Sequence, residues 1–352
     1  MKQRCTKDNI VFRKEWRFIS KNDRKDYIDA VYCVQSKPSL YDEKVAPGSK
    51  NLFDSFSLVH INLTHLAHGN FNFLSWHRYY VWVYEQALKE CGYNGPIPYW
   101  EWGFDVDDPD QSPVFDGSPY SLGSNGAPLP DRAATYALGP PPPVPPPPNG
   151  GFQIPAGRGG GCLMKGPFSN MTCNLGPIAP ASDRSYSSDW FRYNPQCLVR
   201  DLGTFIGPRW VAFNWTVWTI EESPDIVAFE SRLTGDSGKG HGNHTQNGFG
   251  LHGGGHSFVG GWTGQMGDFY AAPQDPVFFL HHAQIDRVWS IWQWLDFEER
   301  REAAYGTLTF FNVPPTRNGT VDDLLDMGKL APALPQRDIM STIDGPFCYF
   351  YE

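Results

Sequence analysis

Long apolar runs and clusters of basic residues are both missing from this sequence of 352 residues. No stretch approaches the ~20 apolar residues that a membrane-spanning helix needs, and the first residues, MKQRCTKD, contain no apolar signal core. The 29 lysines and arginines are outnumbered by 38 aspartates and glutamates, which gives a formal net charge of −9. Such an acidic chain is not expected to bind nucleic acid or an anionic membrane surface. We therefore predict no nucleic-acid partner, no membrane partner and no obligate protein partner.

The seven cysteines include no CxxC pair, the spacing that zinc ribbons and thiol redox sites use. Their scattered positions instead predict up to three disulfides and one free thiol, the pairing being left open. The chain also contains five N-x-[ST] sequons, which we predict to be glycosylated. Both features favour a secreted protein, in which case a signal peptide has been removed. The sequons lie at Asn62, Asn170, Asn214, Asn243 and Asn318.

The sequence has no internal repeat and no convincing linker, so residues 1–352 are predicted to form one domain. Residues 139–161, rich in proline and glycine, are predicted to be a surface insertion. The apolar spacing favours a mainly α protein with long irregular loops and few short strands. The predicted helices cover Ser20–Gln35, Phe53–Leu63, Trp76–Gly92, Leu198–Phe205, Ser223–Leu233 and a last helix that Asp275-Pro276 begins and that ends near Arg301.

Most of the ten histidines fall into two widely separated blocks. Histidines four apart, such as His252 and His256, lie on one face of a helix and can bind one metal from the same side. Neither block has a cysteine nearby or a carboxylate at ligand spacing, and an all-imidazole set suits copper, with a single three-histidine zinc site as the competitor. Two blocks facing each other in a four-helix bundle favour a dinuclear centre. The blocks are His60, His65, His68 and His77, and His252, His256, His281 and His282.

Four segments resemble the tyrosinase and polyphenol oxidase family, in particular its short secreted fungal members. Residues 68–85, HGNFNFLSWHRYYVWVYE, are similar to the first copper signature, and residues 275–286, DPVFFLHHAQID, to the second. PYWEW (Pro98–Trp102) and the terminal GPFCYFY are also similar to segments of such proteins. The resemblance implies a single mainly α domain built on a four-helix bundle that holds two copper ions.

Carried over to this sequence, the resemblance implies that His60, His68 and His77 hold one copper and that His252, His256 and His282 hold the other. His281 and His65 then become non-ligands, although His65 is kept as an alternative to His60. Asp286 and Glu85 are expected to support the ligand rings, and Arg78 to pair with a buried carboxylate. The residues expected to line the substrate pocket are Gly253, Ser257, Met266 and Phe269, with Phe269 as a gate over the second copper.

The sequence departs from many relatives at three positions that bear on substrate. Leu66 stands where many members have a cysteine that forms a thioether to a ligand, so no thioether is predicted. Gly253 and Thr234 stand where good monophenol hydroxylases often have asparagine and a water-holding glutamate. These differences favour o-diphenols over monophenols.

The predicted function is therefore that of a type-3 copper oxidase, which uses O₂ to oxidise o-diphenols (catechols) to o-quinones. Whether it also hydroxylates monophenols weakly is left open. The alternatives are an oxidase of o-aminophenols or of a secondary-metabolite phenol and, in other classes, a hemocyanin-like O₂ carrier or a zinc hydrolase.

Overall fold

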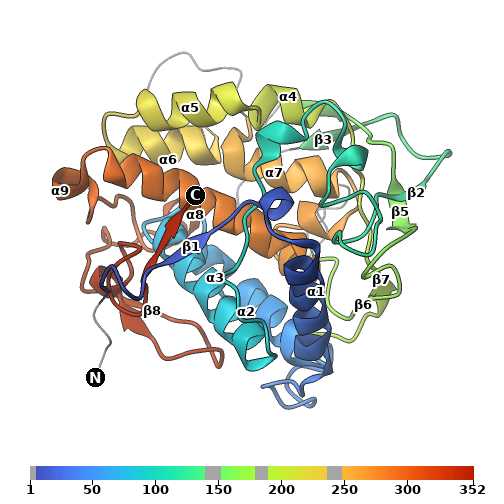
Figure 1. Cartoon of the computed structure of the whole chain (residues 1–352), viewed down its shortest axis with the longest axis horizontal. Coiled ribbons are helices and arrows are strands. Elements are labelled where there is room, and N and C mark those ends of the chain that lie inside the picture. Colours follow the sequence, from blue (N-terminus) through green and yellow to red (C-terminus); the bar gives the residue numbers. More distant parts are fainter. Residues whose placement is uncertain (1–4, 139–151, 179–188, 236–247) are drawn as a thin grey trace.

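The structure is a computed structural model, and it describes residues 5–138, 152–178, 189–235 and 248–352 (Figure 1). Four helices form its centre: α2 (Leu52–Ala67), α3 (Phe73–Glu90), α7 (Gly250–Gly260) and α8 (Val277–Trp294). Helix α8 crosses the middle of the molecule, with α2 and α3 on one side and α7 on another. This arrangement confirms the predicted mainly α fold built on a four-helix bundle.

Shorter helices surround this bundle. Helix α1 (Lys21–Ser36) packs on α2 and α3, while α5 (Phe213–Glu221) and α6 (Ile226–Thr234) lie together beside α8 (Figure 1). The remaining helices, α4 (Ile206–Trp210) and α9 (Phe297–Arg300), are short. Within the described residues, no helix is both long enough and apolar enough to cross a membrane.

The strands of the described residues form five pairs at the edges of the bundle. Strand β1 (Val11–Arg13) runs parallel to β10 (Tyr349–Tyr351), which brings the two ends of the chain together. The other pairs are antiparallel: β2 (Gly126–Pro128) with β5 (Gly160–Leu163), β3 (Thr135–Leu138) with β4 (Phe152–Pro155), β6 (Thr172–Cys173) with β7 (Gln196–Cys197), and β8 (Leu324–Leu325) with β9 (Leu334–Pro335).

Aromatic side chains fill the interface between α3 and α8. The rings of Tyr84 and Phe279 stack with their centroids 3.5 Å apart, and Tyr80 stacks on Phe279 at 5.7 Å. Trp76, Trp289 and other large rings are almost completely buried in the same core. Aromatic rings bury a large apolar area each, so this core can hold polar histidine side chains in fixed positions at its centre.

The predicted starts of two helices agree with the structure to within one residue. The Ser20 hydroxyl accepts a hydrogen bond from the backbone N–H of Asp23 and caps α1. The carboxylate of Asp275 accepts one from the N–H of Val277 at the start of α8, and it also forms a two-oxygen ion pair with Arg200. Asp275 and Arg200 are both fully buried, so this pair fixes where α8 begins.

The helix predicted over Leu198–Phe205 is wrong. Leu198–Gly203 is extended and Thr204–Phe205 forms a turn, because the backbone groups of this segment bond to distant segments of the chain and not to one another. The carbonyl of Leu198 accepts from the N–H of Leu163, and the N–H of Asp201 donates to the carbonyl of Val259. The helix predicted over Ser223–Leu233 is present as α6, but Asp225, not Ser223, caps it by accepting from the N–H of Ala228.

Of the segment predicted to be a surface insertion, residues 139–161, the structure describes only residues 152–161. Phe152–Pro155 forms β4 and pairs with β3. Ile154 in this strand is completely buried, while Gln153 and Pro155 on either side of it are exposed. The surface insertion stays a prediction.

Three disulfides and one free thiol agree with the prediction from cysteine count. Cys5 pairs with Cys348 at the chain ends, and Cys33 pairs with Cys91 across the ends of α1 and α3. Cys162 pairs with Cys197. The free thiol is Cys173, which is buried.

Candidate metal centre

Helices α2 and α3 deliver three buried histidines to one point. His60 lies on α2, His68 directly follows that helix, and His77 lies on α3. Their possible ligand atoms all lie within 4.8 Å of one another. The sharp change of direction after Ala67 lets His68 approach His77, with ring centroids 4.7 Å apart. We call these three residues the first histidine group.

Helices α7 and α8 deliver a second group, consisting of His252, His256, His281 and His282. Their possible ligand atoms also lie within 4.8 Å of one another. His252 and His256 are one turn apart on α7, as their spacing predicted. The two groups adjoin, because the ring of His282 stacks on that of His77 at 4.2 Å. The chain therefore brings together all six predicted ligands.

Backbone carbonyl oxygens orient four of these rings. The Nδ1 atom of His60 lies 2.7 Å from the carbonyl oxygen of Tyr270, and that of His256 lies 2.9 Å from that of Met266. His68 and His77 make the same contact within their own segments, to Thr64 and Phe73. A carbonyl only accepts, so each Nδ1 carries the ring proton and each Nε2 keeps a free lone pair for a metal.

The remaining nitrogens of these groups fit a metal site. The Nε2 atoms of His60, His77 and His252 are buried and have no hydrogen-bond partner among the described residues. An unpaired buried polar atom costs about 1–3 kcal/mol, and a bound metal ion would remove that cost. Burial lowers the pKa of all these imidazoles, which keeps them in the neutral form that binds metals. The pKa falls to about 3 for His60 and about 4 for His256, and well below its usual range for His68, His77, His252 and His282.

His281 and His282 point to different partners. The Nε2 atom of His282 lies 3.3 Å from that of His256, in the space between the ligand-bearing helices. The Nδ1 atom of His281 instead accepts a hydrogen bond from the indole N–H of Trp102, at 3.2 Å. In the first block, the Nε2 atom of His65 lies 2.6 Å from the hydroxyl of Tyr270. These contacts engage one ring nitrogen each of His281 and His65, while Nε2 of His281 stays buried with no partner among the described residues, so their exclusion from the ligand set stays a prediction.

A family model agrees with this geometry. The model for tyrosinase, described as the common central domain of tyrosinase, matches residues 50–295, which include both histidine groups. The chain belongs to the tyrosinase family. The cofactor of this tyrosinase-family protein is a pair of copper ions, and the protein is a type-3 copper oxidoreductase.

Fungal proteins of this family match almost the whole chain. Tyrosinase P of Aspergillus terreus is 36% identical over 354 residues, covering 99% of this chain and 93% of its own. N-acetyl-6-hydroxytryptophan oxidase ivoB of Emericella nidulans is 35% identical over 368 residues, covering 99% of this chain and 94% of its own. The structure of a polyphenol oxidase from Thermothelomyces thermophila superimposes with a TM-score of 0.88 at 38% identity, over 99% of this chain and 90% of that one.

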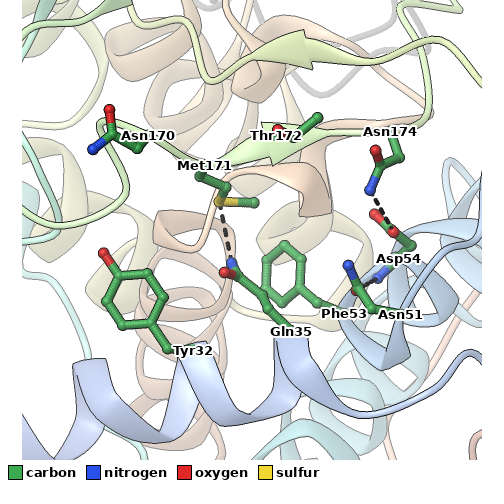
Figure 2. Close-up of a pocket in the computed structure, with 9 residues that line it drawn as sticks. All are labelled: Tyr32, Gln35, Asn51, Phe53, Asp54, Asn170, Met171, Thr172 and Asn174. Carbon is green, nitrogen blue, oxygen red and sulfur yellow. Dashed lines mark hydrogen bonds between the residues drawn. The ribbon is translucent and has the colours of Figure 1, made fainter.

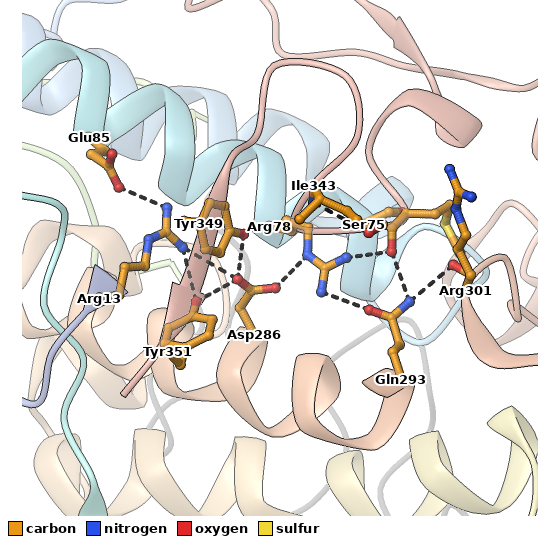
Figure 3. A network of polar contacts seen from close by, with 12 residues as sticks. Arg13, Ser75, Arg78, Glu85, Asp286, Gln293, Arg301, Ile343, Tyr349 and Tyr351 are labelled. Carbon is orange, nitrogen blue, oxygen red and sulfur yellow. Dashed lines mark hydrogen bonds and ion pairs between the residues drawn. The ribbon is translucent and has the colours of Figure 1, made fainter. Parts of the chain in front are cut away.

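A buried network of charges links the ligand-bearing helices α3 and α8 (Figure 3). Asp286, one turn after His282 on α8, accepts hydrogen bonds from Arg78 at 2.5 Å and from Arg13 at 3.4 Å. Arg13 also pairs with Glu85 at 2.8 Å. The prediction that Arg78 pairs with a buried carboxylate is confirmed. Asp286 and Glu85 bond to arginines here while backbone carbonyls orient the rings, so their predicted support of the ligands stays a prediction.

The four residues predicted to line the substrate pocket lie in different places. Gly253 is half-buried beside His252 on α7. Met266 is buried and acts through its carbonyl, which contacts His256. The ring of Phe269 packs against His68 of the first histidine group with centroids 4.9 Å apart, and its role as a gate stays a prediction. Ser257 lines a separate cavity of about 290 Å³ together with Tyr136 and Phe205, and no histidine of the two groups is among its described lining residues.

A second cavity, of about 350 Å³, lies between α1, the start of α2 and strand β6 (Figure 2). Asp54 on its wall accepts a hydrogen bond from Asn174 at 2.8 Å. Its described lining residues include no histidine of the two groups either. Asn170, one of the predicted glycosylation sites, lies on its rim and is exposed.

One residue that contacts the second histidine group was not found from the sequence. Trp102 lies in the PYWEW segment, but no spacing showed that it reaches His281. His241 and His244, which lie in a glycine-rich stretch and are expected to be exposed, fall outside the described residues.

Proposed function

We propose that this protein oxidises o-diphenols to o-quinones with O₂. The observation that supports this proposal best is the pairing of two histidine groups whose free Nε2 atoms converge. When bound, the copper pair supplies O₂ binding and the two-electron oxidation of the phenol. Over the full reaction, two molecules of catechol give four electrons and four protons to one O₂, which yields two quinones and two waters. Because the oxidised substrate leaves as a small planar quinone, the chain needs only to admit and orient one aromatic ring.

In this proposal His60, His68 and His77 hold one copper, and His252, His256 and His282 hold the other. The protein contributes rings that are already oriented and neutral, so that little rearrangement is needed when copper binds. Gly253, half-buried beside His252, leaves room for a phenol ring next to the second group. Phe269, packed on His68, forms an apolar surface along which that ring enters.

The direct test is to measure bound copper and then the oxidation of 4-methylcatechol and of tyrosine by the same preparation. We expect two coppers per chain and at least tenfold faster turnover of the catechol. About one zinc per chain would contradict the copper proposal, and a copper protein that binds O₂ but never oxidises catechol would indicate a hemocyanin-like carrier. Rapid turnover of tyrosine would contradict the preference for o-diphenols.

Gly253 bears on a second candidate activity, weak monophenol hydroxylation. It stands where good monophenol hydroxylases often have asparagine, and it lies half-buried beside His252. Under this alternative, Gly253→Asn should raise the turnover of tyrosine relative to that of 4-methylcatechol. An unchanged ratio of the two turnover rates would contradict a role for this position in substrate choice.

The relatives favour a third candidate, a phenol oxidase of secondary metabolism. The relative from Emericella nidulans is named for N-acetyl-6-hydroxytryptophan, a phenol larger than tyrosine. If this chain acts on such a phenol, its kcat/KM for 6-hydroxytryptophan derivatives or o-aminophenols should exceed that for 4-methylcatechol. A kcat/KM at least tenfold lower would favour the simple diphenol.

We also propose that the protein is secreted and glycosylated. The three disulfides fit an oxidising compartment, and the four sequon asparagines within the described residues, Asn62, Asn170, Asn214 and Asn318, are all exposed. The fifth, Asn243, lies outside them. Mass measurement before and after treatment with an N-glycosidase, on protein secreted by a fungal host, would detect the sugars; an unchanged mass would contradict the proposal.

A further inference from the structure

His281 is a completely buried histidine to which the proposed ligand set gives no role. It directly precedes His282 on α8. Its ring centroid lies 4.5 Å from that of His256 and 5.7 Å from that of His252, so it contacts the two α7 histidines. A polar ring in this position is costly to bury unless it has a hydrogen-bonding partner.

The Pro98–Trp102 segment supplies that partner and lies along α8. The backbone N–H of Trp100 donates to the carbonyl of Leu280 at 3.2 Å. The carboxylate of Glu101 accepts from the side chains of Gln284 and Arg287, at 2.8 and 2.9 Å. These contacts follow α8 for two turns and hold Trp102 opposite His281.

The hydrogen bond from Trp102 fixes the orientation of the His281 ring. An indole N–H can only donate, so Nδ1 of His281 accepts in this contact, while its Nε2 is buried with no partner among the described residues. Trp102 is itself completely buried and therefore has no alternative position in solvent. The ring of His281 thus projects from α8 in a fixed orientation.

Helix α7 packs directly against the His281 ring. A Cβ atom on Gly255 would lie 2.3 Å from Cε1 and 2.4 Å from Nδ1 of His281, so the α7 backbone contacts the ring with no space between them. Gly255 directly precedes His256 and lies one turn after His252. The distance that the His281 ring projects from α8 toward α7 therefore sets how far His282 on α8 lies from the two histidines of α7.

We propose that His281, held by Trp102, is a positioning residue that fixes α7 against α8 so that His252, His256 and His282 meet at one copper ion. This inference rests on the ligand set proposed above. It gives the first residue of the HH pair and the PYWEW segment a shared role. It also predicts that the second copper depends on this contact and that the first copper does not.

The test is copper retention by the full-length, copper-loaded protein during titration with a chelator. Trp102→Phe removes the N–H donor and keeps an aromatic ring, and His281→Leu removes the acceptor. For both, we expect the chelator concentration that removes half of the second copper to fall at least tenfold, while the first copper is retained as in the native protein. A single remaining Cu(II) has no partner to couple with, so a paramagnetic resonance signal should appear as the second copper leaves.

Three further variants separate positioning from a loss of folding. His281→Asn keeps an acceptor near the position of Nδ1 and should retain the second copper within about threefold of the native protein. Gly255→Ala should behave like His281→Leu although alanine favours a helix by about 1 kcal/mol. Trp262→Phe is the matched tryptophan control, because the indole N–H of Trp262 has no hydrogen-bond partner, and it should behave as native.

Several outcomes would overturn the inference. Native retention in both Trp102→Phe and His281→Leu would show that the contact has no positioning role. Equal loss of both coppers would show that its effect is not specific to α7. Loss in His281→Asn with native retention in Trp102→Phe would make His281 a ligand. If the unaltered protein bound fewer than two coppers, the proposed ligand set itself would be wrong. That result is distinguishable from the results above, which concern only the positioning role of His281.

Discussion

Two histidines of the first block contact the same residue, Tyr270, and differ in which nitrogen they use. His60 bonds through Nδ1 to the backbone carbonyl and keeps Nε2 free. His65 uses Nε2, which lies against the tyrosine hydroxyl. Its ring also stacks on Phe310 with centroids 5.6 Å apart. The His65 ring is therefore held by packing and by a hydrogen bond through Nε2, whereas the Nε2 of His60 points to no protein partner among the described residues. This difference supports His60 as the ligand.

This difference predicts opposite results for two alanine variants. His60→Ala removes one of three nitrogens, so the protein should retain about one copper per chain and lose catechol oxidation by at least ~10²-fold. His65→Ala should retain both coppers, with a loss of stability of about 1–3 kcal/mol from the broken hydrogen bond. Copper analysis and thermal unfolding of both variants provide the check. Copper loss in His65→Ala with full copper in His60→Ala would make His65 the ligand.

For single residues, the sequence predicted which histidines lie together on a helix, but not where the other side chains of the site point. Histidines at i, i+4 on α7 and the capped HH helix were predictable because each pattern is local. The placement of Phe269 on His68 was not, because it depends on how a loop after α7 crosses to α2. Ser257 was expected in the phenol pocket, yet as the next residue on a helix it points about 100° away from His256 and lines another cavity.

At the scale of elements, the disulfide Cys33–Cys91 ties the last turn of α1 to the residue that follows α3. Both helices pack on α2, which carries His60. The bridge closes a loop of 58 residues, which restricts the unfolded chain more than the folded one. Its contribution is therefore to the stability of the three-helix unit that positions the first histidine group.

Removing this bridge should weaken the fold without changing the chemistry. We expect the double variant Cys33→Ser with Cys91→Ser to lose about 2–4 kcal/mol of unfolding free energy, measured by denaturant titration of the copper-loaded protein. At a temperature where it remains folded, its kcat for catechol should stay within twofold of native. Cys173→Ser, at the free thiol, is the control for the substitution itself. A native unfolding curve for the double variant would contradict the stabilising role.

Helices were predictable where capping residues and apolar spacing coincide, as in α1 and at the start of α8. The Leu198–Phe205 segment shows where this fails. Its apolar residues have helix-like spacing, but its backbone is bonded to Leu163, Val259 and other distant residues. Long-range pairing of this kind outweighs local preference and cannot be read from the segment itself. The strand at Phe152–Pro155 was missed for the same reason.

At the scale of the whole molecule, both chain ends reach the back of the metal centre. Strand β1 carries Arg13, and β10 carries Tyr349 and Tyr351, whose hydroxyls donate to Asp286 at 2.6 and 2.5 Å (Figure 3). The Cys5–Cys348 disulfide closes the same pair of ends. Arg78, next to His77, completes the network. The ends therefore stabilise the ligand helices α3 and α8 from outside the bundle.

This network predicts loss of stability in acid. Burial alone would raise the pKa of Asp286, but the charges of Arg78 and Arg13 and the hydroxyls of Tyr349 and Tyr351 lower it below its usual value. A carboxyl with a folded pKa below its unfolded value contributes stability above the unfolded pKa, about 4. That contribution is lost as the pH falls through the folded pKa. We expect the unfolding temperature of the copper-loaded protein to decrease below about pH 4.

Asp286→Asn tests whether this carboxylate causes the acid sensitivity. Removing one member of a buried ion pair costs about 3–5 kcal/mol, because Arg78 and Arg13 would keep their charges without this acceptor. We expect that loss at pH 7 and a shallower decline of the unfolding temperature in acid, since the variant has no carboxyl left to protonate there. Asp323→Asn is the matched control: Asp323 pairs with the exposed Arg317, and surface pairs contribute about 1 kcal/mol or less. A native stability at pH 7 in Asp286→Asn, with an unchanged acid decline, would place the acid sensitivity elsewhere and leave the chain ends with no electrostatic role behind the metal centre.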